Sequence, residues 1–292
     1  MRIRNALAHQ RDLRIRRNAY ELIQCYFAYH SNRIEGSALT YEQTTSIYVR
    51  GVVSATARVD DINETRKHFD LLDFVIDHAN EPITSEMVKR MHAILKRATS
   101  AERNPYQVVG GFKVFENEIE GTITRTKTAL PSEVPGLVDE LFRDYESADH
   151  GSEVFLSTIA EFHWRFERIH PFSDGNGRIG RALLFRECLR RDESPIIVTE
   201  DMRDFYIRGL RNTRRNPDTS PTRSALRRTS SRHPTCLSSK TTRRRFGSLT
   251  SRTTALSIRP RMPKRPCPPK KPWDGSCEES LTGAHPFPAS RC

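Results

Sequence analysis

An all-α fold with one short β-hairpin is predicted for most of this chain, followed by a tail of a different kind. Three observations predict it. Apolar residues recur every three or four positions through most of the first 213 residues, which is the spacing of one face of an α-helix. A single interval is rich in Val, Ile, Thr and Phe instead, and after residue 213 no helical period of useful length is left. Strands and helices do not alternate and no segment is repeated, so a doubly wound sheet is not expected.

The helical segments follow one another closely along the chain. Residues 10–30 form a broad apolar face that contains Leu13, Ile15, Tyr20, Leu22, Ile23, Tyr26 and Phe27. Segments 62–80 and 83–98 show the same spacing, and Pro82 marks the end of the first of them. The pattern continues through 131–145, 153–169, 178–191 and 199–212.

The non-helical interval reads VVGGFKVFENEIEGTITRTKTAL and spans residues 108–130, with glycines at 110, 111 and 121. Runs of β-branched and aromatic residues interrupted by glycine are typical of short strands joined by turns. We therefore expect a β-hairpin between two helices here.

The basic character of the chain is confined to its tail. The formal net charge is +12, but residues 1–213 carry 30 Lys and Arg against 32 Asp and Glu, which gives −2. Residues 214–292 carry the other 18 basic and 4 acidic residues, which gives +14, and 11 of the 17 prolines. Such a composition buries too little apolar surface to fold. The tail is predicted to be disordered, or to be the product of a reading-frame shift, because the helical pattern ends abruptly.

Cysteine usage and hydropathy indicate the compartment. Only Cys25 and Cys188 lie before the tail, each in an apolar helical pattern, so a disulfide framework is not expected and a reducing environment is favoured. No apolar run approaches the roughly 18 residues of a membrane span. The charged start of the chain has no apolar segment behind it and predicts no signal peptide. These features favour a cytoplasmic protein without a membrane partner.

The most informative stretch is HPFSDGNGRIGR at 170–181. Pro171 disfavours helical backbone at the residue before it, and DGNG at 174–177 consists of two turn-forming pairs. The helical pattern resumes at Arg178. The stretch is therefore predicted to be a loop between two helices, anchored by Phe172 in the core, with its glycines at the N-terminus of the second helix.

This arrangement favours a metal-bound polyphosphate. Free N–H groups at a helix N-terminus bind anions, and Arg178 and Arg181 lie three residues apart beside them. Asp174 would repel phosphate unless a cation lay between them, and Mg²⁺ is usually held by one or two carboxylates together with substrate phosphates. His170 can take a proton from an incoming hydroxyl group.

The stretch resembles the signature of the Fic family, HxFx(D/E)GN(G/K)RxxR, at every defined position. The likeness extends over about residues 60–212. It implies a Fido fold and an adenylyltransferase that moves AMP from ATP to a protein hydroxyl, with His170 as the base and Asp174 on Mg²⁺. It places Gly175, Asn176 and Gly177 around the α- and β-phosphates, Arg178 on the phosphates and Arg181 on the γ-phosphate. Relatives with Lys in place of Gly177 transfer phosphate instead. The resemblance also assigns hairpin 113–129 to docking of a target protein and Tyr206 to the adenine.

A second motif lies far upstream, where residues 31–36 read SNRIEG. Considered by itself, this motif places Ser31 and Glu35 one turn apart on a helix that ends at Gly36, and Glu35 would face solvent. Beside the Fic signature, it resembles the family's inhibitory motif (S/T)xxxE(G/N). Glu35 is then expected to pair with Arg181 at the γ-phosphate position. In some relatives the same residue helps to remove AMP, so the resemblance also implies removal of AMP as a second activity beside transfer.

The predicted organisation is an N-terminal helical region (1–82), a catalytic core (83–213) and the tail (214–292). Alternatives to AMP transfer are a transferase of another nucleotide or of phosphate, and nucleic-acid binding through the tail, which contains no recognisable module. A P-loop and a G-x-S-x-G elbow are absent from the sequence, and no Cys pair accompanies His163 and His170 to suggest zinc. A homodimer is an alternative to a monomer.

Overall fold

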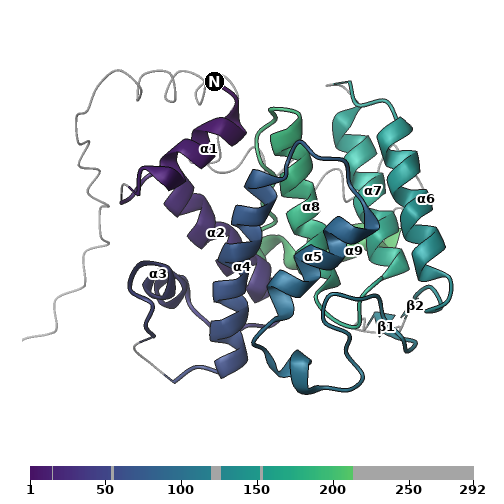
Figure 1. The fold of residues 1–292 in the computed structure, drawn as a ribbon, viewed down its shortest axis with the longest axis horizontal. Coiled ribbons are helices and arrows are strands. Elements are labelled where there is room, and N and C mark those ends of the chain that lie inside the picture. The colour runs from purple at the N-terminus through teal and green to yellow at the C-terminus, as the bar shows by residue number, and fades with distance from the viewer. Residues whose placement is uncertain (15, 54–55, 120–125, 152–153, 213–292) are drawn as a thin grey trace, which may run out of the picture. The chain divides into compact units, whose positions relative to one another are not determined.

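The computed structural model describes residues 1–14, 16–53, 56–119, 126–151 and 154–212. The chain divides into two units, Met1–Arg252 and Thr253–Cys292, and every described residue belongs to the first. The elements are α1 (Ile3–Asp12), α2 (Ala19–Ile34), α3 (Tyr41–Arg50), α4 (Val59–Asp77), α5 (Ser85–Lys96), the 3₁₀ helix η1 (Ser100–Arg103), β1 (Glu118–Ile119), β2 (Thr126–Lys127), α6 (Val134–Ser147), α7 (Phe155–Ile169), α8 (Asn176–Arg190), the 3₁₀ helix η2 (Glu200–Met202) and α9 (Arg203–Asn212). Figure 1 shows this arrangement, and the all-α fold with a short hairpin is confirmed.

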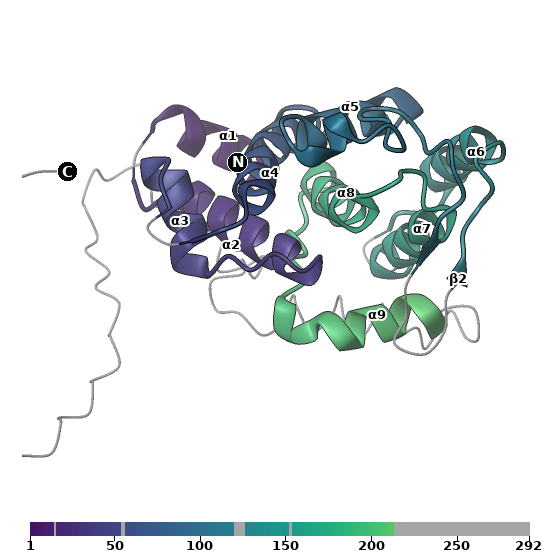
Figure 2. The ribbon, with the colours of Figure 1, turned by 90° about the horizontal axis from the view of Figure 1, so that it is seen from below.

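Helix α8 is the central element. In Figure 2 it lies between α2 and α4 on one side and α7 on the other, with α9 beneath it. Its sequence predicts a helix with one apolar face, but in the structure nearly all of its residues are buried, including Arg178, Arg181, Arg186 and Glu187. Buried charges are tolerated where they are paired, and the structure pairs Arg186 with Glu187. One core joins residues on both sides of position 82, among them Phe27, Leu72, Met91, Phe166 and Leu183.

The helix starts follow local capping rules. Asn18 accepts a hydrogen bond from the Glu21 backbone N–H at 2.8 Å, and Thr84 accepts one from Met87 N–H at 3.1 Å. Side-chain oxygens at these positions satisfy N–H groups that have no partner in the first turn. Both helices therefore begin where their sequence provides a cap.

The N-terminal region differs from the sequence prediction in two ways. The single apolar face at 10–30 was wrong, because the chain breaks between α1 and α2. Leu13 at the break and Leu22 on α2 are about half exposed, and Ile15 lies outside the described residues. Helix α3 was missed, although it carries a readable signal. Thr40 and Gln43 cap each other reciprocally, and Gly51 ends the helix with φ +72°, which is the capping box followed by a left-handed C-terminal residue.

The hairpin is present at its base. Strands β1 and β2 pair antiparallel, with Glu118 opposite Lys127 and Ile119 opposite Thr126. Its tip, residues 120–125, lies outside the described residues. The buried Lys113 joins this base to the loop after α7: its backbone N–H donates to Pro171 O at 2.9 Å, and its Nζ donates to Thr128 Oγ1 at 2.6 Å.

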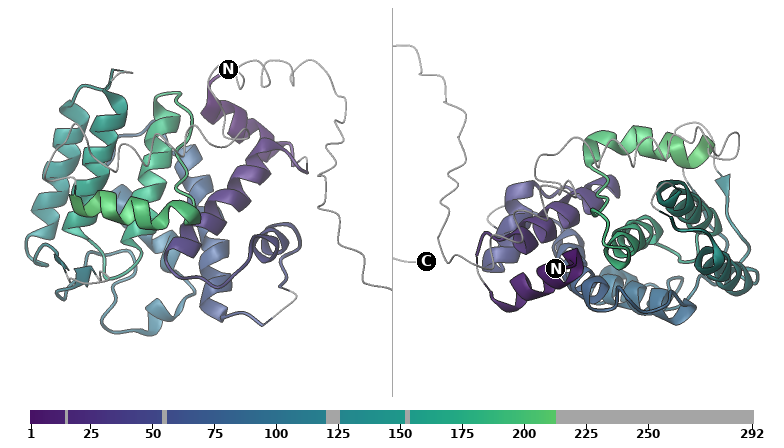
Figure 3. Two further views of the ribbon diagram at one scale, coloured as in Figure 1. Left: turned by 180° about the vertical axis from the view of Figure 1, so that it is seen from behind. Right: turned by 90° about the horizontal axis from the view of Figure 1, so that it is seen from above.

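The C-terminal elements close one side of the bundle. Helix α9 lies across α7 and α8 in the rear view (Figure 3), and its Tyr206 shares an apolar cluster with residues of both helices. Two contacts tie this region to the end of α2. Arg33 pairs with Glu200 at 2.5 Å, and Arg203 Nε donates to Ile34 O at 3.1 Å.

The described ranges also bear on cysteine pairing and on the membrane. Their two cysteines, Cys25 and Cys188, are buried, and neither forms a disulfide within these ranges. No helix within these ranges is both long enough and apolar enough to cross a membrane.

The predicted tail, residues 214–292, lies outside the described residues, and its composition alone supports a test. We expect truncation after Asn212 to leave the midpoint of thermal unfolding nearly unchanged, because the tail lacks the apolar residues needed for a core. Circular dichroism melts of the two forms check this. The cut spares α9, which carries Tyr206. A truncated protein that no longer unfolds cooperatively would show that the tail supplies part of the core.

Candidate active site

The stretch singled out in the sequence forms the connection between α7 and α8. His170 ends α7 with φ +53°, and Gly175 precedes α8 with φ +81°. Both values lie in the left-handed region, which glycine adopts without strain and histidine does not. The Asn176 side chain closes the loop, since its Oδ1 accepts from Phe172 N–H and its Nδ2 donates to Phe172 O, both at 2.8 Å.

A histidine that the sequence analysis missed holds this loop from α5. The His92 ring stacks on the fully buried Phe172 ring with centroids 4.2 Å apart and planes 5° apart. Gly110 N–H donates to His92 Nδ1 at 3.0 Å, which leaves the proton on Nε2 to donate to Asp174 O at 3.2 Å. The loop backbone is thereby fixed at both Phe172 and Asp174.

His170 has the properties of a neutral general base. Its Nδ1 lies 3.3 Å from Glu167 O, an acceptor only, so Nδ1 carries the proton and Nε2 is free to accept one. Burial, aided by the positive charge of Lys113, lowers the pKa of His170 to about 4. The imidazole is therefore uncharged at neutral pH.

The structure brings the two distant motifs together. Arg181 of α8 is 2% exposed, and its Nη2 lies 2.6 Å from Glu35 Oε1 at the end of α2. Ser31 binds the same guanidinium group twice, with its Oγ 3.1 Å from Nε and its carbonyl oxygen 3.0 Å from Nη2. Burial acts to raise the pKa of Glu35, but the charges of Arg181 and Arg178 outweigh it and hold that pKa below its usual value.

The carboxylate of Glu35 lies against the first turn of α8. A Cβ atom added at Gly177 would lie 2.3 Å from Glu35 Oε1 and 2.9 Å from Arg181 Nη1. The absence of a side chain at Gly177 is thus what lets an anion approach this helix N-terminus. In the described structure, that anion is the carboxylate of Glu35.

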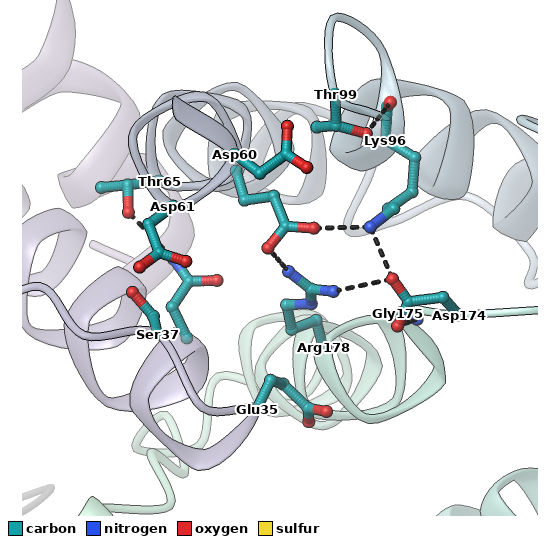
Figure 4. A network of polar contacts seen from close by, with 12 residues as sticks. Glu35, Ser37, Asp60, Asp61, Thr65, Lys96, Thr99, Asp174, Gly175 and Arg178 are labelled. Atoms are coloured by element: carbon teal, nitrogen blue, oxygen red, sulfur yellow. Dashed lines mark hydrogen bonds and ion pairs between the residues drawn. The ribbon is translucent and has the colours of Figure 1, made fainter. Parts of the chain in front are cut away.

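A second charged cluster surrounds Asp174 (Figure 4). Lys96 Nζ lies 2.6 Å from Asp174 Oδ2 and 2.5 Å from Glu64 Oε1. Arg178 donates to the other oxygen of Glu64 and lies 3.4 Å from Asp174 Oδ2. The sequence analysis named Asp174 and Arg178 but missed Glu64 and Lys96.

Tyr206 is buried rather than open to a ligand, with 1% exposure. Its hydroxyl lies 2.7 Å from His163 Nε2, and its ring centroid lies 5.9 Å from the guanidinium carbon of Arg181. In the described structure, the Tyr206 ring lies in an apolar cluster next to the guanidinium group of Arg181. The adenine contact of Tyr206 stays a prediction.

The site so assembled can be compared with known proteins. The profile of the Fic/DOC family matches residues 82–187, from just before α5 to the last turn of α8. This chain carries a Fic/DOC domain. The domain includes the whole HPFSDGNGRIGR loop, whereas Ser31, Glu35, Glu64 and Tyr206 lie outside it.

Relatives that are named for an activity resemble this chain over most of its length. Protein adenylyltransferase Fic of Drosophila persimilis is 27% identical over an alignment of 219 residues that covers 71% of this chain and 40% of that protein. The same enzyme of Drosophila virilis is 26% identical over an alignment of 219 residues that covers 71% of this chain and 42% of that protein. The chain thus spans about two fifths of the length of these relatives.

Solved structures share the fold. A Fic-domain signaling protein from Bacteroides thetaiotaomicron superposes with a TM-score of 0.62 at 24% identity, covering 77% of this chain and 93% of that chain. A Fic family protein from Desulfovibrio desulfuricans gives 0.58 at 22% identity, covering 86% and 73%. Fic-1 from C. elegans gives 0.57 at 20% identity, covering 85% and 72%. The expected Fido fold is confirmed.

Asp174 of the Fic/DOC domain has the chemistry needed to hold a magnesium ion together with a phosphate ligand. Burial raises the pKa of Asp174, but Arg178 and Lys96 outweigh it and the net shift is strongly downward, so the carboxylate is ionised. Its side chain is 43% exposed. The described residues hold no group of three or more His, Cys, Asp or Glu that could bind a metal by themselves. One carboxylate with substrate phosphates is the usual way in which Mg²⁺ binds.

Close packing of α7 against α8 in the Fic domain gives a stability prediction. A Cβ atom at Gly180 would lie 2.5 Å from Glu167 Oε1 and 2.8 Å from the buried His163 ring. We expect Gly180→Ala to reduce the free energy of unfolding by about 1–3 kcal/mol, as overpacking does, measured by urea denaturation.

Gly136 provides the matched control, because it is an exposed helical glycine with nothing within 4 Å of an added Cβ. Gly136→Ala is expected to leave stability unchanged or slightly higher, since alanine favours a helix. Equal destabilisation by both variants would contradict the packing argument at Gly180.

Proposed function

We propose that this chain is a protein adenylyltransferase that transfers AMP from ATP with Mg²⁺ to a hydroxyl side chain of a target protein. One observation carries the proposal: the complete HxFxDGNGRxxR loop is folded at the N-terminus of a buried helix, with a neutral His170 at one end and paired arginines at the other. The named activity of the Drosophila relatives supports it.

His170 is proposed to accept the proton of the target hydroxyl through Nε2. The proton on Nδ1, held by Glu167 O, fixes the tautomer that this role needs. Its left-handed backbone at the very end of α7 keeps the ring next to the phosphate-binding turn. Deprotonation makes the hydroxyl oxygen a better nucleophile for the α-phosphate of ATP.

The phosphates are proposed to bind at the start of α8. Gly175, Asn176 and Gly177 lie at a helix N-terminus, which attracts anions, and the Gly175 N–H already donates to Asp174 Oδ1 at 2.6 Å. Arg178 and Arg181 add two guanidinium groups that can each bind phosphate oxygens in pairs. Asp174 would hold Mg²⁺ together with substrate phosphates, which would supply positive charge close to the leaving pyrophosphate.

Glu35 is proposed to inhibit this reaction. Its carboxylate is bonded to the guanidinium group that the γ-phosphate would use, and two anions cannot share that position without strong repulsion. ATP then binds without the correct orientation of its α-phosphate.

The target protein is proposed to dock on hairpin 113–129 by adding a strand to its edge. Lys113 joins the base of this hairpin to the catalytic loop. A cytoplasmic location and a homodimer also stay proposals.

Intact-protein mass spectrometry tests the function. The Glu35→Gly variant is incubated with Mg²⁺ and ATP, alone and with a cell lysate, and parallel samples carry a radioactive label in the α- or the γ-phosphate. The proposal expects a mass gain of one AMP per modified site and label only from α-labelled ATP. Transfer of the γ-label would indicate a phosphotransferase. If neither labelled ATP labels a protein, AMP transfer and phosphate transfer are both rejected.

The pKa of His170 predicts an unusual pH dependence. Because that pKa is lowered to about 4, the base loses its lone pair only when the pH falls through that value. We expect the acid limb of AMP transfer to lie below about pH 5 rather than near the 6.5 of a free imidazole. Turnover of Glu35→Gly across pH 4–8 measures it.

Folding must be monitored in the same buffers, because the stability of the protein also falls as the pH falls. Burial also lowers the pKa values of His68 and His163 to about 3, so the unfolded state binds more protons below pH 6.5 and stability falls as the pH falls. Circular dichroism separates this loss from titration of the base. A limb near pH 6.5 in a fully folded enzyme would contradict the lowered pKa of His170.

A further inference from the structure

The ammonium group of Lys96 occupies a position between two carboxylates. Its Nζ lies 2.5 Å from Glu64 Oε1 and 2.6 Å from Asp174 Oδ2, and the Lys96 side chain is 5% exposed. This positive group lies between two carboxylate oxygens that come from separate elements. A bound metal cation would occupy the same kind of position. Figure 4 shows Lys96 reaching from the end of α5 to Asp174.

The surroundings keep Lys96 in that position. Its carbonyl oxygen accepts from Thr99 Oγ1 at 2.7 Å, which fixes the last residue of α5. Its aliphatic stem packs against the loop, because a Cβ atom added at Gly175 would lie 3.7 Å from Lys96 Cδ. A positive charge at a helix C-terminus is also favoured by the helix dipole.

The cluster is balanced in charge. Glu64 and Asp174 contribute two negative charges, and Lys96 and Arg178 contribute two positive charges. Without Lys96, two carboxylates would share one arginine. A pair of carboxylate oxygens on opposite sides of an open position is a ligand set that divalent cations prefer.

We infer that Lys96 is a tethered cation that fills a metal position between Glu64 and Asp174, so that the Mg²⁺ carried by the nucleotide is the only exchangeable cation of this site. The inference rests on the proposed function for the presence of that nucleotide. Lys96 is a positioning residue in this scheme, since it acts through Asp174. It holds the carboxylate in place before the nucleotide arrives and suppresses binding of a divalent cation alone.

Titration with Mn²⁺ in the absence of nucleotide tests the inference, with free Mn²⁺ followed by electron paramagnetic resonance. Lys96→Met removes the ammonium and keeps a stem of similar length, and we expect it to bind one Mn²⁺ at least about tenfold more tightly than the natural chain, because a like charge at the site is lost. Lys96→Arg keeps the charge and is expected to bind no better than the natural chain. The double variant Lys96→Met, Glu64→Gln removes one carboxylate and is expected to lose the gain.

Three results would overturn the inference. The first is a folded Lys96→Met variant with no gain in Mn²⁺ affinity, and the second is an equal gain in the double variant. The third needs no variant and covers the case in which Lys96→Met does not fold: the natural chain with ATP is expected to bind one Mn²⁺ per nucleotide, and a stoichiometry of two would show that the position is open. The titration without nucleotide needs no turnover, so a failure of AMP transfer would reject the proposed function and leave this result standing.

Discussion

Glu35→Gly is expected to transfer AMP about ten- to a hundredfold faster than the natural chain. The 2.6 Å contact between Glu35 and Arg181 is a hydrogen bond between charged groups, and such bonds contribute roughly 1.5–3 kcal/mol. That free energy opposes every productive binding event of the γ-phosphate. Removing the carboxylate abolishes this opposing free energy and leaves His170, Asp174 and the loop backbone unchanged. Label from α-labelled ATP, counted on the protein, measures the gain.

Two further variants separate the charge from the space it fills. Glu35→Gln keeps the side chain and loses the charge, so it is expected to recover part of the gain. Arg181→Ala is expected to abolish the gain in the Glu35→Gly background, because the freed position then has no guanidinium group for the γ-phosphate. Effects of two groups that touch are not additive. If Glu35→Gly is no faster than the natural chain on itself or in a lysate, Glu35 is an ordinary helix end.

His170→Ala should lower AMP transfer by about 10²–10⁴-fold in the Glu35→Gly background, the usual range for loss of a general base. ATP affinity is expected to stay within a few-fold, because the proposed phosphate contacts come from the α8 N-terminus and its arginines. Calorimetric titration with ATP and a rate assay with α-labelled ATP are compared on the same preparation.

His9 is a suitable control, since it is exposed near the end of α1 and bonds to no residue of the loop. His9→Ala is expected to leave both measurements unchanged. Loss of ATP affinity in parallel with turnover in His170→Ala would assign His170 to the structure of the loop instead of the chemistry.

The sequence was sufficient where local signals decide the structure. Pro171, the two turn-forming pairs and the resumed helical period predicted a loop between α7 and α8, and the structure has it there. The apolar face at 10–30 failed because periodicity ignores a break in the backbone, and Arg14 and Arg17 adopt positive φ values at that break. Helix α3 was overlooked, although Thr40, Gln43 and Gly51 are local signals.

The second charged cluster could not be predicted in the same way. Glu64, Lys96 and Asp174 come from α4, α5 and the loop before α8, and their meeting depends on how these elements pack. In the sequence, Glu64 and Lys96 resemble solvated charges on amphipathic helices. His92 was hidden for the same reason, since its role depends on stacking against a phenylalanine 80 residues away in the chain. Resemblance to a family supplied the pairing of Glu35 with Arg181 beforehand, which spacing alone does not.

The packing of α2 against α8 determines how Arg181 can be released from Glu35. Phe27 of this helix is buried and its ring stacks on Phe185 of α8 with centroids 5.1 Å apart, and the neighbouring Ala28 is also fully buried. Undocking α2 would expose this apolar surface to water, at roughly 25 cal/mol for each Å². Glu35 instead lies at the helix end, about a third exposed, before Gly36 with φ +92°. Rotation about its side-chain bonds exposes no core and is a fast motion, on the nanosecond scale or below for exposed residues. If Glu35 inhibits as proposed, we expect it to leave Arg181 by torsion of its own side chain while α2 stays in place, so that the barrier to release is set by the single ion pair of Glu35 with Arg181.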